Sequence, residues 1–211
     1  MVEAASVGIN YITAFFGLIE KAKLKDGETV LVTGASGGVG SSVVKIAKSK
    51  GARVIAVDRQ VMAPEMARRL GIDLALSGQS DDIVNRAKQF TQGKGVDVAF
   101  DCVGGPLFEV ALNSLGLGGR QLNITSVGDR RVSFDLIDFY HRRLTLYGID
   151  TLSLDVIASG DVLETLRPSF EQGLLTPPSI EKTCSLEEAV EAYHEVETGK
   201  TKGKIVITFP H

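Results

Sequence analysis

The feature that most constrains the fold is a glycine-rich segment, residues 33–40, which lies between an apolar run and a helical pattern. The run before it, residues 29–33, is short and β-branched, as expected of a strand buried on both faces of a parallel sheet. The segment after it, from Val39 to about Lys50, has apolar residues at helical spacing. The chain is therefore predicted to pass from a buried strand into a helix through a glycine turn.

The same alternation of strands and helices continues along the chain. Six strands separated mostly by helices predict an α/β fold with a Rossmann-type doubly wound parallel sheet, because parallel strands are joined by right-handed crossovers. A helix over 161–172 is expected to be kinked or split at Pro168, and Ser80 or Asp81 is expected to cap the helix over 81–91. Besides 29–33, the predicted strands are 53–58, 74–76, 97–101, 120–124 and 144–149, and a helix over 4–22 precedes them.

A proline-containing linker over residues 175–178 marks a change in the pattern. Beyond it we expect a strand near 179–183, a helix over 186–197 and a strand over 204–209. We therefore predict a dinucleotide-binding domain over residues 1–174, including an N-terminal linking helix, and a C-terminal strand–helix–strand segment over residues 175–211.

The glycine segment favours an anionic ligand. Small residues allow a sharp turn and a close approach of the backbone, and the free N–H groups at a helix start can hold a pyrophosphate. The strict G-x-G-x-x-G pattern is absent, because Ala35 stands ahead of Gly37 and Gly40. A tight turn that binds nothing is the alternative, and no P-loop pattern occurs.

The end of the second strand bears on the choice of cofactor. Asp58 lies 18 residues after Gly40, where an acidic side chain can accept hydrogen bonds from the adenosine ribose and repel a 2′-phosphate. Arg59 could instead hold that phosphate. The residues therefore leave NAD and NADP open.

Charge and composition exclude several classes of function. The net charge is −3 and no basic tract with interleaved aromatic residues occurs, so a nucleic-acid partner is not expected. We find no apolar run of about 18 residues and no signal peptide, so no membrane partner is expected and a cytoplasmic location is predicted. Two isolated cysteines and three histidines without ligand spacing predict no metal site.

The whole sequence resembles the medium-chain dehydrogenase/reductase superfamily, especially its zinc-free quinone oxidoreductase branch. The resemblance covers only the cofactor-binding half of such proteins. It rests on four stretches: Ala4 and Ala5 followed by residues 12–15, the loop at 35–40, residues 100–105, and a tail with Ala189, His194 and residues 203–207.

The resemblance implies an NAD(P)H-dependent oxidoreductase that transfers hydride to a quinone, an enone or another small carbonyl compound. It also implies a homodimer formed through the strand at 144–149, and a separate catalytic domain that the segment from Pro177 onward would complete. Without that domain, this segment must pack differently or expose apolar surface.

Individual roles follow from the same resemblance. The cofactor-binding residues would be Ser36, Gly37, Gly38, Val39 and Gly40 at the pyrophosphate, Asp58 and Arg59 at the adenosine ribose, Cys102, Val103 and Gly104 beside the adenosine, and Thr13, Ser126, Gly148 and Ile149 at the nicotinamide end. Thr13 could instead bond its own helix backbone, and Cys102 is expected to be a small buried side chain rather than a reactive thiol.

Two alternatives remain for the function. The loop also fits the Thr-Gly-x-x-x-Gly-x-Gly pattern of short-chain dehydrogenases, but none of the four tyrosines is followed by the lysine that those enzymes need. The chain could also bind NAD(P)H without catalysing a reaction, since no general acid is identified beyond the polar candidates Tyr140, His141 and Asp150. The arginine pairs at 130–131 and 142–143 are expected to form a solvated face.

Overall fold

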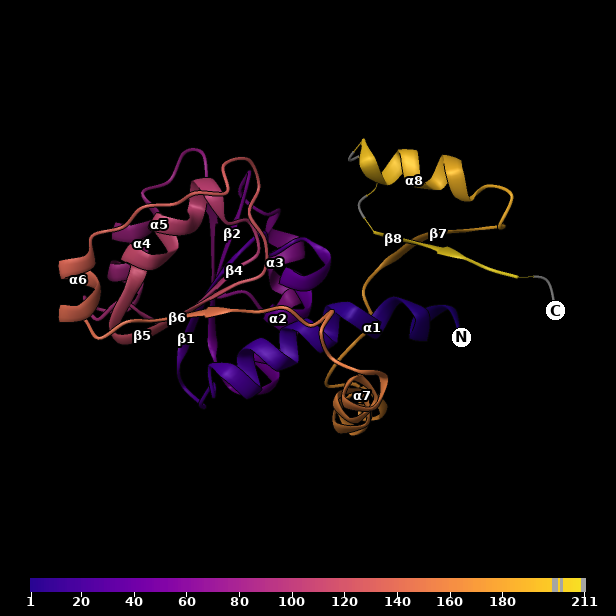
Figure 1. The fold of residues 1–211 in the computed structure, drawn as a ribbon, viewed down its shortest axis with the longest axis horizontal. Coiled ribbons are helices and arrows are strands. Elements are labelled where there is room, and N and C mark those ends of the chain that lie inside the picture. Colours follow the sequence, from indigo (N-terminus) through magenta and orange to yellow (C-terminus); the bar gives the residue numbers. More distant parts are fainter. Residues whose placement is uncertain (199–200, 202, 210–211) are drawn as a thin grey trace.

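The computed structural model describes residues 1–198, 201 and 203–209, and it shows a parallel sheet covered by helices with a smaller unit beside it (Figure 1). The chain begins with α1 (Val2–Phe15) and a π-helical segment, η1 (Phe16–Lys21). The sheet contains β1 (Thr29–Thr33), β2 (Arg53–Asp58), β3 (Leu74–Ser77), β4 (Val96–Asp101), β5 (Leu115–Asn123) and β6 (Thr145–Gly148). The helices between them are α2 (Gly38–Ser49), α3 (Pro64–Leu70), α4 (Ile83–Phe90), η2 (Gly105–Leu107), α5 (Phe108–Ser114) and α6 (Leu136–His141). The chain then forms α7 (Val156–Glu171), β7 (Ile180–Cys184), α8 (Ala189–Glu197) and β8 (Lys204–Ile207).

The order of the strands confirms the predicted doubly wound sheet. It is β3-β2-β1-β4-β5-β6, and every neighbouring pair is parallel. The chain moves outward from β1 in one direction and then returns to place β4 on its other side. This order creates a switch point between β1 and β4. We call the region at the carboxyl ends of these two strands, between the loops that follow them, the crevice, because ligands of such folds bind there.

Two apolar cores cover the two faces of the sheet, because successive residues of a strand point to opposite faces. In β1, Val30 and Val32 belong to the core that includes α1 and α2, whereas Leu31 belongs to the core that includes α4 and α5. All five residues of β1 are buried, which accounts for the uninterrupted apolar pattern in the sequence.

The N-terminal helix begins two residues earlier than predicted, at Val2, and ends one residue earlier, at Lys21. Together, α1 and η1 form a helix over Val2–Lys21 that is long and apolar enough to cross a membrane by length and composition alone. This corrects the expectation that no such segment exists. Half of the helix is buried within the protein, and Tyr11, Ala14 and Leu18 lie fully inside the core with α2. Its apolar character is therefore explained by packing.

Two details of the helices also differ from the prediction. Asp82, rather than Ser80 or Asp81, caps α4 by accepting a bond from the Asn85 N–H at 3.1 Å. The Asp81 carboxylate instead accepts from the Ser77 N–H at 2.7 Å. The helix predicted over 161–172 begins earlier, at Val156, and continues through Pro168, which stands in its last turn. Asp155 fixes that earlier start by accepting a bond from the Ala158 N–H.

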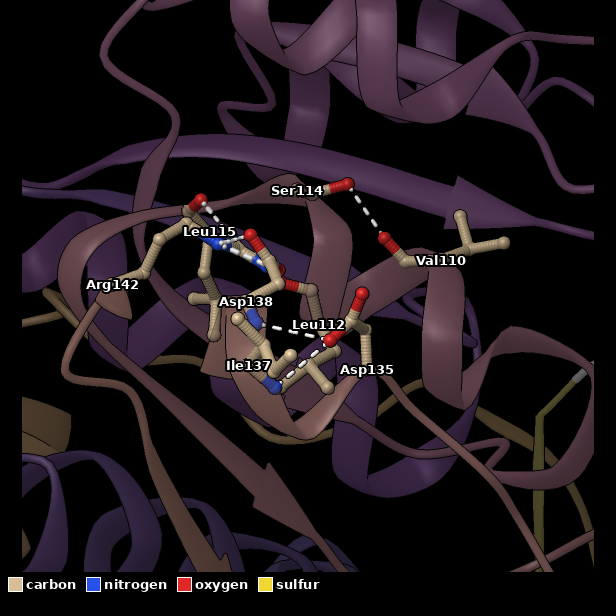
Figure 2. Close-up of polar contacts among 8 residues, drawn as sticks. All are labelled: Val110, Leu112, Ser114, Leu115, Asp135, Ile137, Asp138 and Arg142. Atoms are coloured by element: carbon tan, nitrogen blue, oxygen red, sulfur yellow. Dashed lines mark hydrogen bonds and ion pairs between the residues drawn. The ribbon is translucent and has the colours of Figure 1, made fainter. Parts of the chain in front are cut away.

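Helix α6 was not predicted, and Arg142 holds it against α5 (Figure 2). The guanidinium donates to the carbonyls of Leu112 and Leu115 at 3.3 and 2.8 Å, where α5 ends. The same side chain forms an ion pair with Asp138. Arg142 therefore satisfies carbonyl groups at a helix C-terminus, which corrects the expectation that it belongs to a solvated face.

The C-terminal unit is a two-stranded parallel sheet, β7 and β8, with α8 beside it (Figure 1). The carbonyl of Thr176 anchors its connection to the main sheet, accepting from the Tyr11 hydroxyl at 2.6 Å and from Lys45 Nζ at 2.9 Å. Apolar side chains of α8 are left exposed, which is one of the two outcomes expected for this segment: Val190, Tyr193 and Val196.

Candidate functional site

The loops that follow β1 and β4 meet at the switch point of the sheet. A Cβ atom placed on Gly34, directly after β1, would lie 3.3 Å from the Val103 side chain and 3.6 Å from Cβ of Cys102. Both of these residues directly follow β4. The glycine loop and the residues that follow β4 therefore lie side by side at this switch point. The cofactor-binding roles expected for residues 102–104 stay predictions.

The glycine loop is folded so tightly that it excludes side chains. Gly34 adopts a φ of +63°, and its carbonyl accepts a hydrogen bond from the Gly37 N–H at 3.0 Å. A Cβ atom on Gly40 would lie 2.1 Å from the Gly34 carbonyl oxygen and 2.9 Å from Cα of Ala35. The first turn of α2 thus contacts the loop backbone directly, which only glycine permits at position 40.

The start of α2 presents unsatisfied N–H groups to the crevice. Gly37 is the residue before the helix, and no side chain caps it. The first intrahelical bond runs from the Ser41 N–H to the Gly37 carbonyl at 2.9 Å, so the amides of Gly38 and Val39 have no helical partner. Gly37 is exposed and Gly38 and Val39 are half-buried. This arrangement is suited to an anion.

Asp58, at the carboxyl end of β2, is fixed against the glycine loop. Its carboxylate accepts bonds from the Ser36 N–H at 3.2 Å and from the Ser36 hydroxyl at 2.9 Å. Ser36 is exposed, so these bonds border the open side of the crevice. Arg59 is exposed beside it, and its carbonyl accepts from the Ser77 hydroxyl at 3.1 Å. The structure therefore places a fixed negative charge beside the loop.

A buried carboxylate organises the loop after β4. Asp101 is fully buried, and its Oδ1 accepts bonds from the Thr33 hydroxyl, the Val103 N–H and the Gly104 N–H at 2.5, 3.1 and 2.9 Å. Burial, together with the negative charge of Asp101 and Asp58, raises the pKa of the Cys102 thiol. A raised pKa disfavours the thiolate and therefore argues against an activated nucleophile. The side chain is half-buried, rather than buried as the sequence predicted.

Gly104 and Ser126 join the loops after β4 and β5. Gly104 adopts a φ of +66°, and a Cβ atom there would lie 2.2 Å from the Thr125 carbonyl oxygen. The Ser126 hydroxyl accepts from the Gly105 N–H at 3.2 Å and donates to the Asp129 carbonyl at 2.8 Å. Ser126 thus has a structural role, and its predicted position near the cofactor stays a prediction.

Thr13 connects α1 to the loop after β6. Its hydroxyl lies 2.7 Å from the hydroxyl of Thr151, and both side chains are buried. The alternative in which Thr13 bonds its own helix is not observed. Ile149 is buried and donates its N–H to the Asn123 carbonyl at 2.9 Å, whereas Gly148 is exposed. The predicted nicotinamide-end residues therefore lie at the carboxyl ends of β5 and β6 and on the adjoining face of α1.

Sequence reasoning missed Asn10, which is buried on α1 three residues before Thr13. A Cβ atom on Gly38 would lie 3.0 Å from Oδ1 of Asn10, so this side chain contacts the start of α2. The signal available in the sequence was an amide on an otherwise apolar helix face, at i, i+3 spacing from a hydroxyl. It was overlooked because Thr13 was the one polar residue of this helix that was considered as a site residue.

The catalytic candidates are not brought together. Tyr140 and His141 contact each other on α6, which precedes β6 and therefore lies near the amino ends of the parallel strands, at the edge opposite the crevice. Asp150 follows β6 at the carboxyl edge, and its carboxylate accepts from the Leu152 N–H at 3.0 Å. The general acid of a reductase is therefore not assigned to any of these three residues.

A metal centre is not assigned to the chain. Within the described residues, no group of three or more His, Cys, Asp or Glu side chains could hold an ion. His211 lies outside the described residues.

Comparison with known proteins identifies the family to which this chain is similar. The family described as zinc-binding dehydrogenase matches residues 38–165, which include the glycine loop from Gly38 onward and the loops after β2, β4, β5 and β6. Among curated proteins, a zinc-type alcohol dehydrogenase-like protein of Schizosaccharomyces pombe is 32% identical over 98% of this chain and 60% of its own length. A mycocerosic acid synthase-like polyketide synthase of Mycolicibacterium smegmatis is 29% identical over 99% of this chain.

Solved structures of similar proteins share the fold over almost the whole chain. The enoyl reductase of JamJ is 31% identical, with a TM-score of 0.84 over 99% of this chain and 63% of its own. A mycobacterial quinone oxidoreductase is 25% identical, with a TM-score of 0.86 over 98% of this chain and 64% of its own. The chain thus spans about three fifths of these single enzymes, but only 10% of the polyketide synthase.

Proposed function

The chain belongs to the zinc-binding dehydrogenase family, and from this premise we propose that it binds a nicotinamide dinucleotide in the crevice between the loops after β1 and β4. One observation carries the proposal: α2, which begins at Gly38, has an N-terminus without a side-chain cap. The absence of room for a side chain at Gly40 keeps the Gly34 backbone against this helix end. Backbone N–H groups that are not covered by side chains and have no helical partner, at a switch point of the sheet, suit the pyrophosphate of a dinucleotide.

Each part of the crevice has a proposed role in holding the cofactor. The amides of Gly38 and Val39 bind the pyrophosphate, and Asp58 accepts hydrogen bonds from the adenosine ribose. Residues 102–104 border the adenosine, while Thr13, Ser126 and the chain at Gly148 and Ile149 surround the nicotinamide end. The reduced nicotinamide supplies a hydride when it is bound, and the protein orients it.

We propose that the cofactor is NAD(H) rather than NADP(H). The Asp58 carboxylate is held in place by two groups of Ser36, so it cannot easily turn away from a 2′-phosphate. Two like charges about 5 Å apart repel by about 1–3 kcal/mol at the dielectric of a protein surface. Titration of both reduced cofactors into the chain and into Asp58→Ala tests this: the substitution should raise the affinity for NADPH relative to NADH about tenfold. An unchanged ratio, or a preference of the unchanged chain for NADPH, would contradict selection of NAD(H) by Asp58.

The proposed reaction is the reduction of a quinone, or of a carbon–carbon double bond that is conjugated to a carbonyl group. Its support is that the similar structures include enoyl reductases and a quinone oxidoreductase. Because the chain spans only part of these enzymes, we propose that residues 1–174 form the cofactor-binding domain and that residues 175–211 complete a catalytic domain supplied by another part of the protein. The exposed apolar side chains of α8 fit such a contact.

A second candidate is a module that binds the cofactor without turnover. It is favoured by the position of Tyr140 and His141 at the edge opposite the crevice. Incubation of the 211-residue chain with NADH and a quinone separates the two. Oxidation of many equivalents of NADH per chain rejects the module. Saturable binding without oxidation rejects turnover by this chain alone, and it fits both a module and a cofactor-binding half that needs its catalytic domain.

We also propose a homodimer formed through β6. This strand is at the edge of the sheet, so one side of its backbone is without a neighbouring strand. Light scattering tests the proposal, and a monomeric mass at high concentration would contradict it. A cytoplasmic location stays a prediction.

A further inference from the structure

Asn10 is a buried polar side chain whose amide nitrogen has no hydrogen-bond partner within the described residues. The residue is only 4% exposed and lies on α1, among side chains of the apolar core. Leaving a buried donor unsatisfied is unfavourable, because the amide loses its bonds to water without replacement. Such a group in a folded protein calls for an explanation.

The amide of Asn10 is directed at the start of α2. The three atoms nearest to a Cβ placed on Gly38 are Oδ1, Nδ2 and Cγ of Asn10, at 3.0, 3.2 and 3.3 Å. Gly38 is the first residue of α2, whose N-terminus has no side-chain cap. The unpartnered donor therefore lies beside the same helix end whose backbone amides are unpaired.

Asn10 and Thr13 extend this arrangement along one face of α1. Residues three apart on a helix share a face, and both of these side chains are buried. Thr13 contacts Thr151 beyond the end of β6, whereas Asn10 contacts Gly38 beyond the end of β1. This face of α1 thus follows the crevice from the glycine loop to the predicted nicotinamide end.

We propose that Asn10 is a positioning residue for the dinucleotide, donating a hydrogen bond from Nδ2 to an oxygen of the pyrophosphate held at the first turn of α2. The inference rests on the proposed function. A neutral amide suits this place, because it adds a directional donor to the backbone amides. The amide can rotate about its broad χ2 torsion to present Nδ2 to the ligand.

The test compares Asn10→Leu with the unchanged chain, since leucine has a similar volume but no polar group. Ser6→Ala is the matched control: Ser6 is buried on the same helix, but its hydroxyl donates to the Glu3 carbonyl at 2.7 Å. Dissociation constants are measured for NADH, for ADP-ribose, which lacks the nicotinamide, and for adenosine, which lacks the pyrophosphate. Melting temperatures are measured without ligand.

We expect Asn10→Leu to melt at or above the temperature of the unchanged chain, because it removes an unsatisfied polar group. Its dissociation constants for NADH and ADP-ribose should rise by about tenfold, as expected for the loss of a hydrogen bond to a charged group, while that for adenosine changes less than twofold. Asn10→Asp, which keeps the shape but adds a negative charge, should weaken both phosphate ligands further. Ser6→Ala should bind all three as the unchanged chain does.

Other outcomes overturn the proposal. Equal affinities in both Asn10 variants and the unchanged chain would show that the amide only packs against Gly38, and they would leave the proposed function intact. A loss for NADH but not for ADP-ribose would place Asn10 at the nicotinamide. Failure of the unchanged chain to bind either phosphate ligand would reject the proposed function, and this inference with it.

Discussion

Replacing Gly40 by alanine adds a single methyl group at the point where α2 contacts the glycine loop. That methyl would lie 2.1 Å from the Gly34 carbonyl oxygen, 2.8 Å from its carbonyl carbon and 2.9 Å from Cα of Ala35. All three obstructing atoms belong to the backbone, so no side-chain rotation relieves the overlap. The loop must move away from the helix by about an ångström to reach an ordinary contact distance of about 3.5 Å.

The magnitude follows from the kind of overlap. Overpacking in a well-packed region costs about 1–3 kcal/mol, and we expect a value near the upper end. At about 2–4 °C per kcal/mol for a domain of this size, the melting temperature should fall by about 6–12 °C. The displaced loop should also lose its fit to the pyrophosphate. NADH at a hundred times its dissociation constant stabilises a protein by about 2.7 kcal/mol, and we expect Gly40→Ala to abolish this stabilisation.

The assay is thermal melting with and without NADH, and Gly160→Ala is the matched control. A Cβ on Gly160 meets nothing within 4 Å, and the residue lies inside α7. Alanine there should therefore stabilise the chain by about 1 kcal/mol through helix propensity, while the stabilisation by NADH is unchanged. If Gly40→Ala melts as the unchanged chain does and is still stabilised by NADH, the steric reasoning is refuted.

Three further predictions concern contacts outside the crevice. Arg142→Met should lower the free energy of unfolding by about 2 kcal/mol, because it leaves the carbonyls of Leu112 and Leu115 without their charged donor. A urea midpoint equal to that of the unchanged chain would contradict this prediction. Arg142 also holds the pKa of Asp138 below its ordinary value, chiefly through their hydrogen bond. The stabilisation from this pair is therefore present above about pH 4 and is lost as the pH falls through the lowered pKa. Urea titrations at several pH values should show that Arg142→Met loses less stability in acid than the unchanged chain does. Lys45→Met removes two bonds to the carbonyls of Thr176 and Pro177 and should speed proteolytic cleavage within residues 175–178 several-fold, whereas Lys88→Met on α4 should not.

The sheet could be predicted from the sequence because its strands are buried on both faces. Val30, Leu31 and Val32 are all apolar, since alternate residues enter different cores. The glycine segment then identified the loop after β1, because the positive φ at Gly34 and the close contact at Gly40 both require glycine at these positions. The position of the crevice followed from the fold.

Other features could not be predicted, because they depend on contacts between distant segments. Helix α6 is only six residues long and is held by Arg142, whose partners Leu112 and Leu115 lie far away in the sequence. The pairing of Thr13 with Thr151 joins residues 138 positions apart. Asn10 was missed for the same reason, because only its contact with Gly38 distinguishes it from an ordinary polar residue in a core helix.

The central claim is that the first turn of α2 holds the pyrophosphate of a nicotinamide dinucleotide. Titration of NADH into the isotopically labelled 211-residue chain, followed by the NMR shifts of backbone amides, tests this directly. The account predicts saturable shifts at one site per chain, largest for the amides of Gly38 and Val39. Shifts that are absent at millimolar NADH, or that saturate only at residues away from this turn, would contradict it.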